Sequence, residues 1–503
     1  MKKKNVVLIT SDQQHFDTLG VLNSEIHTPN LDRLANEGML FNRAYCPNPT
    51  CTPTRASIIT GKYPSQHGAW TLGTKLSENQ LTVGDVLQEH SYRTALVGKA
   101  HFQPTVSTEE YPSIESYPLL KDLDFWKTYN ESFYGFETVE LARNHTNEHL
   151  VGQHYALWME EKGCKNWRDY FLAPTGNMDP NQKYTWDIPE KYHYNTWIAE
   201  RTNHFIEQYN ENDDNFFVWA SFFDPHPPYL VPEPWDQMYN PETITLQKGR
   251  NGEHAKNPPH FQLTQEENPD FSAYKETGFG IHGYRTHVDV SEEDHKKLTA
   301  TYYAMVSMMD KYIGEILDKI DELGIAEDTV VIFTSDHGHL FGQHGMFHKG
   351  GFHYEDLIKV PFIAKCPGLI PSGIQTNAIQ SLVDIAPTVL DLCQIPIPHE
   401  MTGLSQAEVW TGQKDEVRDH AICEFRHEPT TIHQKTYVND RYKITVYYNQ
   451  TYGELFDLEN DPHEFNNLWD HEEYQELKAE LFLKYIWAEL GKEMMPMPRI
   501  SHA

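Results

Sequence analysis

Short apolar runs and longer amphipathic stretches alternate along the chain. The apolar runs are rich in β-branched and aromatic residues, as is typical of strands buried on both faces, and they fall at 5–10, 92–98, 216–223, 329–334 and 360–364. The amphipathic stretches predict helices at 28–38, 52–60, 192–209 and 292–323. Strands that alternate with helices predict an α/β fold, in which a large, mostly parallel sheet is flanked by helices on both faces.

The hydrophobic pattern changes near residue 415. A chain of 503 residues exceeds what one core usually supports, so we expect a large α/β domain at 1–414 and a smaller one at 415–503. Segments 102–190 and 232–290 are interpreted as insertions over the carboxyl edge of the sheet, where α/β enzymes bind ligands. The C-terminal part is predicted to be an α+β subdomain, with short antiparallel strands at 421–425, 443–448 and 452–457 and a final helix at 472–490.

Charge and composition exclude several classes of partner. The formal net charge of −32 argues against nucleic acid and against anionic membrane surfaces. No stretch approaches the roughly 20 apolar residues of a membrane span, and the apolar run after the first lysines is too short for a signal peptide. The protein is therefore expected to be cytoplasmic, with self-association into a homo-oligomer left open. The six cysteines have neither metal-finger spacing nor the density of a disulfide scaffold.

The most informative short motif is C-T-P-T-R at residues 51–55. The residues after Cys51 suit the first turn of a helix, and Gly61 suits its C-terminal end. A thiol at a helix N-terminus has a lowered pKa, and Arg55 one turn later can hold an oxyanion or a carboxylate. The alternative interpretation is a buried thiol followed by an ordinary capped helix.

Acidic residues follow two of the predicted strands directly. Asp12-Gln13 comes after the first strand and Asp336-His337 after the strand at 329–334. Carboxyl ends of parallel strands meet at one edge, so these side chains can offer ligands to a hard divalent cation. Taken alone, each Asp is better interpreted as a plain strand-end or capping residue, and the pairing with Cys51 is what favours a metal site.

In combination these motifs resemble the type I, formylglycine-dependent sulfatases of the alkaline phosphatase superfamily. The resemblance covers about residues 1–390 in scattered blocks, whose order is more specific than any single block. The blocks are L-I-T-S-D-Q-Q at 8–14, T-P-N-L-D at 28–32, the Cys51 motif, G-K-A-H at 98–101, D-P-H-P-P-Y at 224–229, S-D-H-G at 335–338 and H-K-G at 348–350.

This resemblance implies roles for individual residues. Cys51 would be oxidised to formylglycine by a maturation enzyme, and its hydrate would bind the metal and attack sulfur. The protein metal ligands would be Asp12, Gln13, Asp336 and His337. The remaining catalytic residues would be Arg55 and Lys99, which hold the hydrate and the sulfate oxygens; His101, which takes a proton from the hydrate; and His226 and Lys349, which face the leaving oxygen.

Three positions depart from the commonest pattern of the family. Thr54 stands where Ser is usual, Gln13 where a second Asp is common, and His337 where Asn is common. The last two changes make the ligand set softer. Calcium remains the first expectation, but manganese or magnesium is more plausible than is usual for the family. Gln13 and His337 also resemble the corresponding residues of the phosphonate monoester and phosphodiester hydrolases of the superfamily. Hydrolysis of a phosphonate monoester or a phosphodiester is therefore the alternative function.

We expect the substrate to be a small organic sulfate ester, with a sulfated sugar as the first choice. The predicted outer substrate contacts are His348, Arg426, His427, Thr431 and His433, although polar residues on an edge strand would look the same. The dense histidines at 337, 339, 344, 348 and 353 allow a zinc site. A glycine-rich loop that carries them without zinc is the preferred interpretation. A non-catalytic binding protein is the third hypothesis for the function.

Overall fold

The computed structural model describes residues 3–143, 146, 148–172, 184–247, 249–275, 290–427, 431–495, 497 and 499–501. Its centre is an eight-stranded sheet in the order β12-β2-β11-β7-β1-β6-β4-β5. These strands are β1 (Asn5–Ser11), β2 (Met39–Phe41), β4 (Tyr92–Gly98), β5 (Thr138–Leu141), β6 (Asn215–Ser221), β7 (Thr329–Ser335), β11 (Phe362–Lys365) and β12 (Ile374–Thr376).

Neighbouring strands of this sheet are parallel except where β11 pairs with β2 and with β7. The prediction of a mostly parallel sheet is therefore confirmed. The register pairs Ser11 of β1 with Ser335 of β7, and Thr10 of β1 with Ser221 of β6. Ser221 in turn pairs with Gly98 of β4. The carboxyl ends of four adjacent strands thus lie level at one edge of the sheet.

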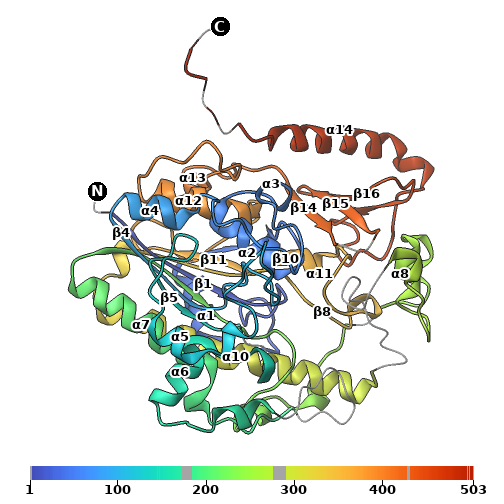
Figure 1. Cartoon of the computed structure of the whole chain (residues 1–503). Helices are drawn as coiled ribbons and strands as arrows, with labels where there is room; N and C mark the ends of the chain where they lie inside the picture. Colours follow the sequence, from blue (N-terminus) through green and yellow to red (C-terminus); the bar gives the residue numbers. More distant parts are fainter. Residues whose placement is uncertain are drawn as a thin grey trace.

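Helices cover both faces of the sheet (Figure 1). One face carries α2 (Cys51–Thr60), α4 (Val83–Glu89), α12 (Ile385–Leu392) and α13 (Ala407–Trp410). The opposite face carries α1 (Pro29–Glu37), α6 (Gln153–Glu161), α7 (Tyr194–Glu211) and α10 (Glu292–Glu322). Because successive side chains of a strand point to opposite faces, Val6 and Leu8 of β1 enter the first core while Val7 and Ile9 enter the second.

The C-terminal part forms a second, antiparallel sheet of β14 (Ala421–Arg426), β15 (His433–Val438), β16 (Tyr442–Tyr447) and β17 (Gly453–Asp457). The last helix, α14 (Gln475–Gly491), packs on it through Leu481 and Tyr485, which share a core with Ile444 and Leu455. The chain therefore has a strand-rich C-terminal subdomain, as its sequence predicts; the boundary at 415 stays a prediction.

One sequence-based strand assignment was wrong, and one strand was missed. The run at 360–364 is not one strand: it divides at Pro361 into β10 (Lys359–Val360) and β11. Proline has no N–H to donate to a ladder, so β10 pairs with β3 (Ala44–Tyr45) in a separate small sheet. The strand β15 was missed, because His433-Gln-Lys-Thr-Tyr-Val alternates polar and apolar residues only weakly.

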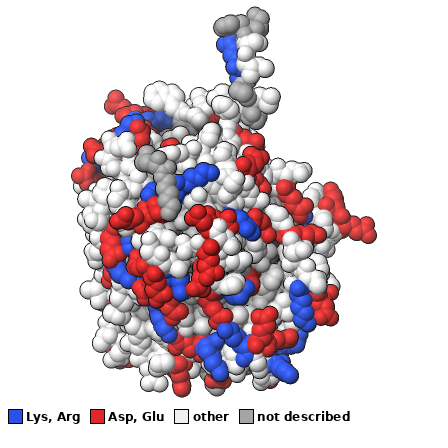
Figure 2. All heavy atoms as spheres, turned by 90° about the vertical axis from the view of Figure 1, so that its left-hand side faces the viewer, with Lys and Arg blue, Asp and Glu red and all other residues white. Residues whose placement is uncertain are grey.

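The surface agrees with the acidic composition. Figure 2 shows acidic side chains spread widely over one face, with basic side chains between them. Among the described helices, none combines the length and the apolar character that a membrane crossing requires.

Candidate active site

Four adjacent parallel strands deliver most of the predicted site residues to one edge of the sheet. Asp12 and Gln13 follow β1, and Asp336 and His337 follow β7. The strands β4 and β6 on the other side of β1 lead to Lys99, His101 and His226. Residues from five separate segments of the sequence therefore converge once Cys51 is added from α2.

The helix α2 positions Cys51 and Arg55. It begins at Cys51, all of its residues are buried, and Gly61 ends it in the left-handed region with φ of 62°. The Cys51 Sγ lies 3.2 Å from His337 Nε2, 3.6 Å from Asp12 Oδ1 and 2.9 Å from Lys349 Nζ. The predicted nucleophile thus stands between the strand-end carboxylates and a lysine.

Arg55 ties the strand ends together. Its Nε donates to Asp336 Oδ2 at 2.8 Å, and its Nη1 donates to Ser221 Oγ at 2.7 Å and to the Lys99 carbonyl at 2.9 Å. Its Nη2 has no hydrogen-bond partner among the described residues. The guanidinium therefore holds three strand ends in place and keeps one nitrogen for a further acceptor.

Four side chains form a group that could hold a metal ion. The ligand atoms of Asp12, Cys51, Asp336 and His337 all lie within 4.8 Å of one another, and all four residues are buried. His337 Nδ1 donates to the Gly338 carbonyl at 2.9 Å, which leaves Nε2 as the lone-pair nitrogen facing the group. Burial lowers the pKa of His337 to about 4, so its ring is neutral and able to ligate at neutral pH.

Gln13 fits the same group through its amide oxygen. Gln13 Oε1 is buried and has no hydrogen-bond partner among the described residues, whereas Nε2 donates to His339 Nδ1 at 2.8 Å. His339 Nε2 then donates to the Tyr229 hydroxyl at 2.8 Å. A buried amide oxygen that no described residue pairs suits a cation ligand, and the bond to His339 fixes which end of the amide carries that oxygen.

The backbone of Gln13 is held as firmly as its amide. Its φ of 63° lies in the left-handed region, its N–H donates to Asp336 Oδ1 at 3.0 Å, and its carbonyl accepts from the Tyr302 hydroxyl at 2.9 Å. The Tyr302 ring also stacks on His339, with centroids 5.2 Å apart. Tyr302 of α10 therefore supports both Gln13, the candidate metal ligand, and His339, which orients the Gln13 amide.

The two buried carboxyl groups have opposite pKa shifts. Burial, with the neighbouring Asp336 and Cys51, raises the pKa of Asp12 to about 7. Burial acts to raise the pKa of Asp336 too, but the neighbouring His337 ring and the positive charges of Arg55, Lys99 and Lys349 outweigh it and hold that pKa below its usual range. Asp336 is therefore ionised at neutral pH, whereas the charge of Asp12 depends on its cationic neighbours.

Positive charge also favours the ionised form of the nucleophile. Burial alone would raise the pKa of the Cys51 thiol, but Lys349 and Lys99 lower it below its ordinary value. The Lys99 ammonium forms a buried ion pair with Asp12 Oδ2. An anion at position 51, whether sulfur or oxygen, would meet the same two ammonium groups.

Lys349 lies next to both Cys51 and His226. Lys349 Nζ is 3.3 Å from His226 Nε2 and 3.3 Å from His337 Nε2. His226 Nδ1 donates to the Pro227 carbonyl at 2.6 Å, so its Nε2 carries the lone pair that accepts from Lys349. This pair can exchange a proton with a group that enters between the two side chains.

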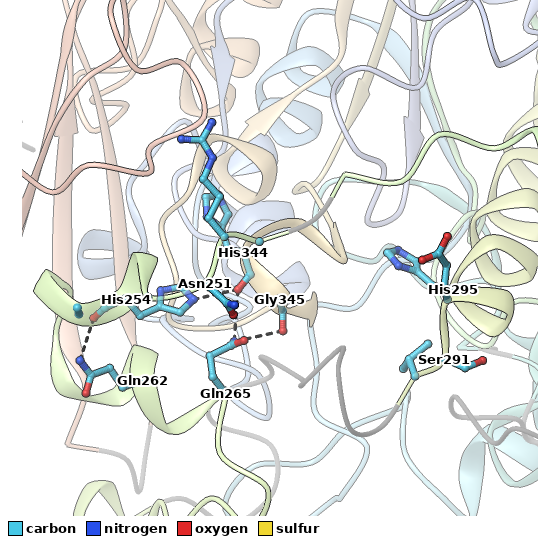
Figure 3. A pocket seen from close by; sticks show the side chains of 14 residues that line it. Asn251, His254, Gln262, Gln265, Ser291, His295, His344 and Gly345 are labelled. Carbon is cyan, nitrogen blue, oxygen red and sulfur yellow. Dashed lines mark hydrogen bonds between the residues drawn. The ribbon is translucent and has the colours of Figure 1, made fainter.

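The hairpin before Lys349 is braced from the 232–290 segment. The hairpin consists of β8 (Leu340–Phe341) and β9 (Phe347–His348). His254 Nε2 donates to the His344 carbonyl at 2.9 Å, and Gln265 Nε2 lies 3.3 Å from the carbonyls of both His344 and Gly345 (Figure 3). The cavity drawn there, of about 730 Å³, has no predicted site residue in its described lining. The cavity is lined by the residues that make these contacts, among them His254, Gln265 and His344.

The remaining predicted site residues have their described contacts with residues outside the group of possible metal ligands. The His348 ring stacks on Tyr229 with centroids 6.3 Å apart, and the His101 N–H donates to Glu115 Oε1 at 2.9 Å. Arg426 lies over the Trp70 ring at 5.2 Å, and His427 Nδ1 is 2.6 Å from Thr71 Oγ1. His433 is half-buried beside Tyr448, and the Thr431 N–H donates to the Tyr274 carbonyl at 2.9 Å. Their contacts with substrate stay predictions.

The histidine-rich segment does not gather into a zinc cluster. Among the described residues, His337 is the one member of this run in the group of possible metal ligands. His344 is instead held by Glu253 and Asp356, and His353 Nδ1 lies 2.7 Å from Thr436 Oγ1. His339 was predicted only as one histidine of this run; its contact with Gln13 joins two distant segments and exists only in the fold.

Comparisons with known proteins agree on the family. A sulfatase family model matches residues 4–395, and a model of the N-sulphoglucosamine sulphohydrolase C-terminal region matches residues 342–488. An arylsulfatase of Clostridium perfringens is 30% identical over 98% of this chain and 95% of its own length. The chain therefore belongs to the sulfatase family and is a sulfuric ester hydrolase.

Solved structures show the same fold. A phosphonate monoester hydrolase from Silicibacter pomeroyi has a TM-score of 0.81 at 21% identity and covers 99% of this chain and 98% of its own. A structure in complex with its substrate D-glucosamine-2-N,6-O-disulfate has a TM-score of 0.71, also at 21% identity, and covers 98% of both chains. The alkaline phosphatase-like architecture is thus shared by proteins named for sulfur and for phosphorus chemistry.

Replacing His339 by Phe should weaken cation binding at this group. Phe keeps the aromatic contact with Tyr302 but removes the acceptor for the Gln13 amide, so the amide is free to turn its oxygen away. We expect affinity for a divalent cation to fall by about 10- to 100-fold in calorimetric titration.

His353→Phe is the matched control, because His353 is equally buried but bonds to Thr436 outside the group. Unchanged cation affinity in a folded His339→Phe protein would contradict the orienting role of His339.

Proposed function

We propose that this protein is a metal-dependent sulfatase that hydrolyses the sulfate ester of a small carbohydrate through a formylglycine derived from Cys51. The observation that carries this proposal is the position of Cys51 Sγ, 2.9 Å from Lys349 Nζ and 3.2 Å from His337 Nε2, within the group of possible metal ligands. Sulfatase-family membership over residues 4–395 supports it.

The proposed cation is held by Asp12, Gln13, Asp336, His337 and the group at position 51. Calcium is our first choice because oxygen ligands predominate, while the ring nitrogen of His337 also suits manganese and leaves magnesium open. A hydrated aldehyde at position 51 and a bound cation would together supply an oxygen nucleophile that is anionic at neutral pH.

The surrounding side chains have distinct proposed tasks. Lys99 and the free nitrogen of Arg55 face the region of the metal group and would bind sulfate oxygens. Lys349 and His226 would protonate or neutralise the leaving oxygen, because their nitrogens lie 3.3 Å apart beside Cys51. His101, held at its N–H by Glu115, would take the proton that regenerates the aldehyde.

A carbohydrate sulfate is favoured by the relatives. An N-acetylglucosamine-6-O-sulfatase of Bacteroides thetaiotaomicron is 25% identical over 95% of this chain and 85% of its own length. The C-terminal match to N-sulphoglucosamine sulphohydrolase covers 342–488, which includes Arg426, His427 and His433. We propose that these three residues contact the sugar.

Hydrolysis of phosphonate monoesters or phosphodiesters is the second candidate. The specific observation is that His337 belongs to the group of possible metal ligands around Cys51 and that Gln13, next to Asp12, has a buried amide oxygen without a partner among the described residues; both residue types were expected from the similarity to phosphonate monoester hydrolases. The high TM-score with such an enzyme shows the shared fold and does not decide between the two reactions.

Cys51 should carry an aldehyde in protein made in its native host or together with a maturation enzyme. Mass spectrometry of the tryptic peptide Ala44–Arg55 is expected to show CHO in place of CH2SH at position 51. Cys46 in the same peptide is an internal control and should remain a thiol. Cys51→Ala should lower kcat by about 10³-fold or more. An unmodified Cys51 with full activity would rule out the proposed nucleophile.

The substrate class can be decided by comparing kcat/KM for sulfated monosaccharides, an aryl sulfate and an aryl phosphonate. We expect a sulfated sugar to give the highest value, with the Cys51→Ala protein subtracted as background on each substrate. A phosphonate that is turned over faster than every sulfate would favour the second candidate. Activity on the aryl sulfate with none on sulfated sugars would support the sulfatase proposal and contradict the proposal of a carbohydrate substrate.

Lys349→Ala should affect poor leaving groups most. An alkyl sulfate needs its leaving oxygen protonated or neutralised, whereas nitrophenolate leaves unaided. We expect kcat/KM to fall by about 10²- to 10⁴-fold for the alkyl ester and clearly less for the nitrophenyl ester. Lys414→Ala, on the exposed surface, is the control. Equal losses on both esters would place Lys349 in binding rather than in leaving-group assistance.

A further inference from the structure

His101 lies in a backbone conformation that is uncommon for any residue other than glycine. Its φ of 61° falls in the left-handed region, three residues after the end of β4. Lys99, two residues earlier, is fixed at both ends, because its ammonium pairs with Asp12 and its carbonyl accepts from Arg55. The direction of the His101 side chain therefore depends on the backbone at residue 101 itself, and that conformation persists only with support from other parts of the fold.

Glu115 provides this support by accepting from three consecutive backbone N–H groups. Its Oε1 accepts from His101 at 2.9 Å, and its Oε2 accepts from Phe102 at 2.9 Å and from Gln103 at 2.8 Å. The glutamate is 2% exposed. Successive N–H groups that converge on one carboxylate form an anion-binding nest, and bonds to a charged acceptor are stronger than bonds to a neutral one. The carboxylate of Glu115 thus fixes the turn at His101.

Arg143, two residues beyond the end of β5, holds the same carboxylate. Its Nη1 donates to Glu115 Oε1 at 3.3 Å and to the Gln103 carbonyl at 3.1 Å, and the residue is 5% exposed. Burial lowers the pKa of Arg143, and the negative charges of Glu115 and Cys51 oppose that effect. The Glu115–Arg143 pair therefore lies within electrostatic reach of position 51. Because both charges of the pair are buried, each needs the other.

Other contacts keep this loop in place without fixing the backbone at His101. The Phe102 ring is fully buried and packs edge-on against Tyr134, with centroids 5.1 Å apart. The Phe102 carbonyl accepts from the Leu76 N–H at 2.9 Å. A change at Glu115 should therefore leave the loop anchored at Phe102 while it releases the N–H groups of residues 101–103.

We propose that Glu115 is a positioning residue of the active site: it orients His101 for the step that releases sulfate, and Arg143 holds Glu115 in place. This inference rests on the proposed function, in which His101 acts after the ester has been cleaved. At that stage the sulfuryl group is bound to one oxygen at position 51. His101 removes the proton of the other hydroxyl there, the carbon forms a C=O bond with that oxygen, and its bond to the sulfate oxygen breaks so that sulfate leaves.

The order of these steps separates a positioning role from a role in stability. An enzyme with a misplaced His101 still cleaves the ester but releases sulfate slowly, so the sulfated form of the enzyme accumulates. The value of kcat then falls, whereas kcat/KM, which includes steps only up to the first irreversible one, stays the same. A variant that is merely less well folded lowers kcat and kcat/KM together, in proportion to the loss of active protein.

Glu115→Gln keeps the length of the side chain but removes its charge and one acceptor oxygen. For the best sulfate ester we expect kcat to fall by about 10²-fold at unchanged kcat/KM. Intact-protein mass spectrometry of the acid-quenched enzyme should show one added SO3 group. His101→Ala should give the same pattern, with a loss in kcat of about 10²- to 10⁴-fold. Arg143→Lys, which keeps the charge but not the forked geometry, should show the same split more weakly.

Hydrogen exchange, followed by mass spectrometry, provides a readout that needs no turnover. In the Glu115→Gln protein the amides of residues 101–103 should exchange about tenfold faster or more, because they lose bonds to a charged acceptor. Glu140→Gln is the matched control. Glu140 lies on β5 and pairs with Arg201, so its replacement should alter neither this exchange nor the ratio of kcat to kcat/KM.

The outcomes separate this inference from the proposed function. A folded Glu115→Gln protein with wild-type kcat, or with kcat and kcat/KM lowered equally and no SO3 adduct, would show that Glu115 does not position His101. An adduct that accumulates in His101→Ala but not in Glu115→Gln would likewise reject this inference alone. If His101→Ala accumulates no adduct either, the proposed role of His101 is wrong and the inference about Glu115 falls with it.

Discussion

The structure depends on the balance of charge in a site with almost no exposure to water. Asp12 and Asp336 face Arg55, Lys99 and Lys349, and the exposed fraction of these five residues does not exceed 8%. An unpaired charge at such depth would cost several kcal/mol, and breaking one buried pair typically destabilises a protein by about 3–5 kcal/mol. Each charge is therefore retained because the others are present, and the group behaves as one unit.

This balance explains why the sheet is arranged as it is. Asp12 follows β1, Asp336 follows β7 and Lys99 follows β4, so the opposite charges meet only if these strands are parallel and end at one level. Arg55 then bonds Asp336, Ser221 and the Lys99 carbonyl, which locks that level in place. The interactions that form the site are thus also interactions that fix the register at the sheet edge.

Sequence reasoning recovered what depends on local pattern and residue type. The parallel strands, the helix at Cys51 and the strand-end acids could be predicted because each has a signal within about ten residues. The bonds from His339 to Gln13 and from Glu115 to the His101 backbone could not, since they join segments by side-chain geometry. The exposure of Trp487 and Leu490 on α14 was equally invisible, because only the fold shows which apolar side chains of that helix are already covered.

The charge of the site does not by itself select sulfur over phosphorus. A sulfate monoester and a phosphonate monoester are both tetrahedral monoanions, so Lys99, Lys349 and the proposed cation would attract them alike. Discrimination must come from groups that contact the leaving alcohol and the rest of the substrate. In this chain His348, stacked on Tyr229, and Arg426, placed over Trp70, are not among these buried charges. We therefore expect specificity to be decided on the C-terminal and hairpin side of the site, and we expect the sheet edge to provide the chemistry that both reactions would share.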